Sequence, residues 1–64
     1  MYEIINEIKK RGKMNGNEVS DYSINVLGRK RKSAGGCLAR AKEYGYIEII
    51  GIVYINGKEV NVYA

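Results

Sequence analysis

Histidine is absent from this 64-residue chain, and cysteine occurs once, as Cys37. Without histidine the chain lacks the commonest general base and metal ligand, and the side chain that titrates near neutral pH. One cysteine excludes an internal disulfide and the ligand sets of structural zinc sites. With no histidine partner, Cys37 is a poor nucleophile, and we expect it to be a small hydrophobic residue of the core. The sequence therefore argues against an enzyme and implies no cofactor.

Long apolar runs are also missing. No stretch approaches the roughly 20 residues that cross a membrane, and the N-terminal residues do not resemble a signal peptide. We therefore expect a cytoplasmic protein with no membrane partner. The length predicts a single domain, residues 1–64. A domain of this size buries only about 60% of the surface of its unfolded chain, so its stability is modest and dimerisation would raise it.

Positive charge is concentrated in one quarter of the chain. The formal net charge is +4, but residues 28–42 contain six basic residues and no acidic one, whereas the remainder contains five basic and seven acidic residues. Within this region the stretch GRKRKSAGG, residues 28–36, joins four consecutive basic residues to four small ones. A solvated turn has the same composition, but such a concentration of charge favours a polyanionic partner.

Apolar spacing predicts two helices in the first half of the chain. The first covers residues 2–11 and has an isoleucine face of Ile4, Ile5 and Ile8. Residues 13–16 are predicted as a connector that has room for a short extended piece. The second helix covers residues 17–27 and has a weaker apolar stripe of Val19, Tyr22 and Val26. Asn17 or Ser20 is its candidate N-cap, and Gly28 ends it.

A third helix is predicted over residues 30–44. Its apolar residues recur at spacings of four and three, which turns one face inward: Ala34, Leu38 and Ala41. The opposite face then carries Lys32, Gly36, Ala39 and Glu43. Gly45 ends the helix.

Residues 46–63 predict a β-hairpin. They are rich in β-branched and aromatic residues, and Asn56-Gly57 is the strongest short signal for a two-residue hairpin turn. This turn sets three pairs of opposed residues: Ile55 with Lys58, Val53 with Val60, and Gly51 with Val62.

Both faces of the predicted hairpin are apolar. One face carries Ile47, Ile49, Val53, Ile55, Val60 and Val62, and the other carries Ile50, Ile52, Tyr54 and Tyr63. Three small helices can bury only one face, so the second face is a candidate homodimer surface. A bulge near Gly51 would change this assignment of faces.

The order of three helices and a hairpin resembles the winged helix-turn-helix family of DNA-binding domains. The resemblance is carried by residues 28–47, GRKRKSAGGCLARAKEYGYI. They contain a turn glycine, a helix with apolar residues spaced by four and three, and then a glycine with two apolar residues: Gly28; Ala34, Leu38 and Ala41; Gly45, Tyr46 and Ile47. The predicted second helix departs from the family pattern at Ser23 and Val26. The resemblance implies an α+β fold in which the hairpin forms the wing.

The resemblance also implies that the third helix enters the major groove of double-stranded DNA. The basic run then supplies charge where the helix N-terminus already attracts phosphate, and the small residues behind it let the helix approach closely. The residues that we expect to contact nucleic acid are Arg29, Lys30, Arg31, Lys32, Ser33, Gly36, Arg40, Asn56 and Lys58. Few of these side chains are suited to reading base edges, so we expect salt-sensitive binding of modest sequence specificity. The prediction is a transcriptional regulator or a nucleoid-type binder.

Several alternatives are consistent with the same residues. Gly35 and Gly36 also suit close packing against another helix, and Asn56-Gly57 also suits a plain hairpin turn. Residues 37–47, CLARAKEYGYI, faintly resemble a basic ribosomal small-subunit protein of the same family, which implies an RNA-binding alternative. A third alternative is a winged helix that binds a protein through its apolar hairpin. The tyrosines are scattered along the sequence, and we expect core and interface roles for them rather than an aromatic platform for bases.

Overall fold

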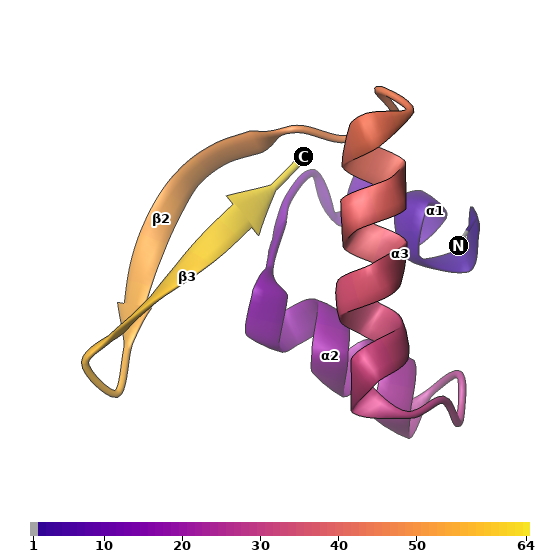
Figure 1. Ribbon diagram of the computed structural model, residues 1–64, viewed down its shortest axis with the longest axis horizontal. Coiled ribbons are helices and arrows are strands. Elements are labelled where there is room, and N and C mark those ends of the chain that lie inside the picture. The colour runs from indigo at the N-terminus through magenta and orange to yellow at the C-terminus, as the bar shows by residue number, and fades with distance from the viewer. Residues whose placement is uncertain (1) are drawn as a thin grey trace.

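The computed structural model describes residues 2–64, which form three helices and one antiparallel sheet. The elements in chain order are α1 (Tyr2–Arg11), β1 (Met14–Asn15), α2 (Gly16–Asn25), α3 (Arg31–Glu43), β2 (Ile49–Ile55) and β3 (Lys58–Tyr63). The helices form the body of the molecule, and the β2–β3 hairpin projects from one side of it (Figure 1). The mixed α+β class is confirmed, and no predicted helix end differs from the structure by more than two residues. No helix in residues 2–64 has the length and apolar character needed to cross a membrane.

The hydrophobic core lies among the three helices. α1 contributes its predicted isoleucine face, and α3 contributes its predicted inward residues, so the rotation predicted for both helices is confirmed. The buried core residues are Ile4, Ile5, Ile8, Met14, Val19, Ala34, Leu38, Ala41 and Ile47. Cys37 is partly buried and packs against this core, in keeping with the role expected for it.

The start of α2 differs from the prediction because Asn15 is its N-cap. The Asn15 side chain accepts a hydrogen bond of 2.9 Å from the Glu18 backbone N–H, and the Glu18 carboxylate accepts one of 2.9 Å from the Asn15 N–H. This reciprocal pair is a capping box, which satisfies two backbone donors at once. The prediction of Asn17 or Ser20 as the cap is therefore wrong.

The buried face of α2 also differs from the prediction. Val19 and Ser23 are fully buried, whereas Val26 is 65% exposed. α2 ends at Asn25, so Val26 is the C-cap residue, where the chain already turns toward Gly28. The predicted apolar stripe is therefore wrong at Val26, and a serine occupies the position that faces the core.

β1 joins the hairpin to make a three-stranded sheet of order β1-β3-β2. The two-residue turn is confirmed, because Asn56 and Gly57 have positive φ angles of 52° and 78°. The predicted register is also confirmed, with the pairs Ile55–Lys58, Val53–Val60 and Gly51–Val62.

A β-bulge interrupts β2 between Ile49 and Gly51, which leaves Ile50 as the extra residue. Beyond the bulge Ile49 pairs with Tyr63. An extra residue in one strand reverses the alternation of its side chains between the two faces of the sheet. Ile49 therefore lies on the face of Ile52 and Tyr63, and its predicted assignment to the opposite face is wrong.

Candidate nucleic-acid interface

The first turn of α3 lacks the features that normally stabilise the start of a helix. Its N-cap residue, Lys30, makes no side-chain hydrogen bond to the helix, and the turn contains no acidic residue. Arg31 and Lys32 instead place positive charge at the positive end of the helix dipole, which is unfavourable. The capping box of α2 shows that this chain builds a complete helix start elsewhere. The start of α3 is thus electrostatically suited to an anion such as phosphate.

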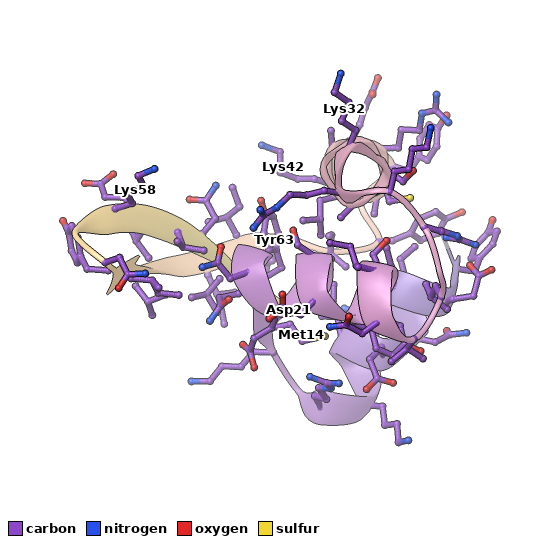
Figure 2. The ribbon with its side chains drawn as sticks, turned by 90° about the horizontal axis from the view of Figure 1, so that it is seen from below. Met14, Asp21, Lys32, Lys42, Lys58 and Tyr63 are labelled. Atoms are coloured by element: carbon purple, nitrogen blue, oxygen red, sulfur yellow. The ribbon has the colours of Figure 1, made fainter. Side chains whose placement is uncertain are left out.

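The outward side of α3 is polar at its start and small along its middle. Four residues on this side are exposed: Lys32, Gly36, Ala39 and Glu43. Figure 2 shows Lys32 pointing away from the body of the protein and Lys42 pointing to the side on which the hairpin lies. Long side chains therefore flank a stretch of helix where the backbone itself is close to solvent.

Gly35 and Gly36 are not needed for packing within the protein. A Cβ atom built on either residue has no neighbouring atom within 4 Å, and neither residue has a positive φ angle. The alternative that these glycines allow close packing against another helix is therefore wrong. Each glycine costs about 1 kcal/mol relative to alanine inside a helix. Within residues 2–64 no contact made by either glycine compensates for this loss of helix stability.

Arg29 differs from the other residues of the basic run because it forms an ion pair with an acidic side chain. Its guanidinium lies 2.9 Å from the carboxylate of Glu3 on α1, and its backbone N–H donates to the Ser23 carbonyl over 2.9 Å. A hydrogen bond from the Glu3 backbone N–H, together with the Arg29 guanidinium, lowers the pKa of Glu3 from 4.5 to about 2. Arg29 therefore links the turn before α3 to the first turn of α1.

The three basic residues that follow are exposed. Within residues 2–64 no ion pair engages the side chains of Lys30, Arg31 or Lys32. Ser33 and Gly36 lie in the same end of α3, so the structure brings five of the predicted contact residues together. Arg40 is exposed nearer the end of the helix.

The remaining predicted contact residues, Asn56 and Lys58, lie at the tip of the hairpin. This tip projects away from α3 (Figure 1), so the structure does not bring them next to the basic turn. In Figure 2 Lys58 and Lys32 nevertheless point to the same side of the molecule. Between them, at the base of the hairpin, a groove of about 220 Å³ is lined by Gly35, Leu38, Ala39, Lys42, Ile49, Asn61 and Tyr63.

Three tyrosines form an exposed cluster that the sequence pattern did not predict. The ring of Tyr46 lies 5.9 Å from that of Tyr2 and 6.2 Å from that of Tyr44, measured between ring centroids. A side-chain hydrogen bond with Tyr2 raises the pKa of Tyr46. The tyrosines are scattered along the sequence, but these three meet in the structure. Tyr44 and Tyr46 are close in the sequence because they flank Gly45. Tyr2 joins them only because α1 packs near the end of α3 in the folded chain.

The described residues contain no group of three or more histidine, cysteine or acidic side chains able to hold a metal ion. No known protein family, curated protein or solved structure matches this chain. The function is therefore inferred from the chemistry of the chain's own surface.

Proposed function

We propose that this chain is a small double-stranded DNA-binding protein of the winged helix-turn-helix type, acting as a transcriptional regulator or a nucleoid-type binder. Three helices followed by a hairpin, with a short strand between the first two helices, are compatible with such a fold. In this proposal α2, the turn at Gly28 and α3 form the helix-turn-helix, and the β2–β3 hairpin forms the wing.

The observation that carries the proposal is the combination of an uncapped basic first turn with two open glycines directly behind it. Both features lower the stability of α3, and no contact within the described residues explains either of them. Local departures of this kind are expected where a surface serves a partner rather than the fold. In this proposal a DNA phosphate supplies the negative charge that the first turn of α3 lacks. The wall of the major groove lies close to the helix at Gly35 and Gly36, which explains why these positions carry no side chain.

The proposed mechanism divides the contact residues into two groups. In this proposal Arg31 and Lys32 neutralise phosphates at the entrance of the major groove and also reach base edges, while Lys30 and Arg40 contact phosphate alone. Asn56 and Lys58 contact phosphate beside the groove. Since few side chains face the bases, affinity comes mainly from charge, and sequence discrimination is modest.

Fluorescence anisotropy titration tests the proposal. The protein is titrated into a labelled random duplex DNA and a matched RNA hairpin at three salt concentrations. We expect tight binding to the duplex, with a slope of log K against log salt of about −5 if roughly six basic residues meet phosphates. Preferential binding of the RNA hairpin would support the RNA-binding alternative instead. Absence of binding to both at low salt would overturn the nucleic-acid proposal.

One observation favours a second candidate, in which the hairpin binds protein. β2 exposes apolar side chains along most of its length. Stable self-association without nucleic-acid binding would favour a purely protein-binding winged helix.

A further inference from the structure

β2 is an exposed strand at one edge of the sheet. In the order β1-β3-β2 only one side of β2 is paired, and Figure 1 shows the hairpin projecting from the helices. The exposed fractions along it are 41% for Ile49, 50% for Ile50, 52% for Ile52, 36% for Val53 and 70% for Tyr54. Apolar surface on this scale, grouped on one strand, is typical of an interaction site.

The composition of β2 makes this edge suited to pairing. The strand reads IIGIVYI and contains no charged residue and no proline, the two kinds of residue that usually protect an edge. The bulge at Ile50 lies near one end of β2, so five regularly paired residues, Gly51 to Ile55, follow it. Left uncovered, an edge of this kind promotes uncontrolled association.

We propose that a second copy of this chain covers β2, through antiparallel pairing of the two β2 strands about a two-fold axis at Ile52. β2 spans Ile49–Ile55, and an axis at its middle residue opposes Gly51–Val53 of one copy to the same residues of the other, with the bulge at the ends of the paired region. Each residue then opposes an uncharged residue of the other copy, so no like charges meet on the axis. On the other side of the described sheet β1 pairs only with Val62 and Tyr63 of β3, and the rest of that edge carries Lys58 and Glu59, charged residues of the kind that protect an edge. The pairing therefore stops at a dimer with the strand order β1-β3-β2-β2-β3-β1.

The size of the chain also favours a second copy as the occupant. A standard specific interface buries about 800 Å² on each partner. That area is roughly a fifth of the 4388 Å² that this chain exposes alone, and five apolar side chains of β2 are exposed: Ile49, Ile50, Ile52, Val53 and Tyr54. Burial of apolar surface between copies gives a small domain the stability that its own core supplies only in part.

The proposed symmetry has a consequence for DNA binding. A two-fold axis between antiparallel strands runs perpendicular to the sheet. A given face of the sheet in one copy therefore continues into the same face in the other copy. α3 lies beside the sheet face of Ile49, Asn61 and Tyr63, as the groove between them shows. Both α3 helices therefore face the same side of the dimer. The dimer itself does not depend on the proposed DNA binding, and it is tested without nucleic acid.

Light scattering after size-exclusion chromatography, over a range of protein concentrations, tests the assembly. We expect the wild-type chain to be dimeric at high concentration and Ile52→Lys to be monomeric under the same conditions. Val26→Lys is the matched control, because it places the same charge on an exposed apolar residue outside β2. Circular dichroism verifies that both variants are folded. A wild-type chain that stays monomeric, or an Ile52→Lys dimer as strong as the wild type, would overturn the proposal.

Disulfide cross-linking tests the register. In a Cys37→Ala background, Ile52→Cys places two cysteines directly opposite each other, with Cα atoms about 4.5–5.5 Å apart, which a disulfide spans. Tyr54→Cys is the control, because four residues along a strand separate its two copies by about 13 Å. We expect oxidised glutathione to cross-link Ile52→Cys much faster than Tyr54→Cys. Equal rates would show that the proposed pairing is wrong.

Discussion

The guanidinium of Arg29 lies 2.9 Å from the carboxylate of Glu3, across 26 positions of sequence. This contact separates the basic run into two parts with different roles. Arg29 holds the turn before α3 against α1, whereas Lys30, Arg31 and Lys32 are exposed at the start of α3. We therefore expect the two parts to differ in their effects on the proposed DNA binding and on stability.

Removing charge from the first turn of α3 tests the difference. We expect Arg31→Ala with Lys32→Ala to weaken duplex DNA binding and to make the salt slope shallower by about 0.9 for each phosphate that is no longer neutralised. Arg29→Ala should change the slope much less and lower the midpoint of thermal unfolding instead. Lys10→Ala, which removes an exposed charge from the last turn of α1, is the control for net charge. Lys10→Ala is compared with Lys32→Ala alone, since each removes one positive charge. Equal decreases in affinity for these two variants would show that the binding follows net charge alone.

Replacing Gly36 with alanine separates stability from binding. The added methyl group meets open space, so α3 should gain about 1 kcal/mol, which raises the unfolding midpoint by roughly 4–8 °C in a domain of this size. If Gly36 lies against the wall of the DNA groove, the same methyl group should weaken duplex binding. Calorimetry and anisotropy titration measure the two effects. Ser20→Ala is the control, since it strengthens α2 without changing α3. A Gly36→Ala variant that binds DNA as tightly as the wild type would argue against close approach at this residue.

The lowered pKa of Glu3, caused first by its backbone hydrogen bond and further by Arg29, predicts a dependence of stability on pH. The pKa of Glu3 in the folded chain is about 2, below its ordinary 4.5, so the unfolded chain takes up this proton more readily. The stabilising contribution is therefore present above pH 4.5 and is lost as the pH falls toward 2. We expect Glu3→Gln to unfold at a lower temperature than the wild type at pH 6, and the difference to disappear near pH 2. A difference between the two unfolding temperatures that is as large at pH 2 as at pH 6 would contradict this prediction.

The elements that the sequence predicted well are those specified by local patterns. The isoleucine spacing in α1, the spacing of Ala34 and Leu38 in α3, and the Asn56-Gly57 turn each act over a few residues, and each is confirmed. The cap of α2 is also readable from sequence, because Asn15 and Glu18 have the spacing of a capping box. The apolar stripe of α2 begins later than this cap, so a prediction based on the stripe places the start of the helix too late.

The features that could not be predicted depend on tertiary contacts. The bulge at Ile50 is visible only in the pairing of β2 with β3, and it reverses the face of Ile49. The contact between Arg29 and Glu3 requires the packing of α1 beside the turn before α3. The open surroundings of Gly35 and Gly36 require all three helices to be in place, because the sequence alone is equally consistent with close packing. The part of the site that sequence patterns do predict is the basic start of α3.

Ser23 is the position where the core is least well satisfied. Its side chain is fully buried, and its Oγ atom makes no hydrogen bond among the described residues. A buried polar atom without a partner costs about 1–3 kcal/mol, so Ser23→Ala should stabilise the protein. Ser20→Ala in the same helix is the matched control, because both substitutions gain the same helix propensity and only the first removes a buried oxygen. Thermal unfolding should therefore show a larger gain for Ser23→Ala. A smaller gain would mean that the Ser23 hydroxyl is satisfied in solution, and a buried water would then be part of the contact between α2 and the core.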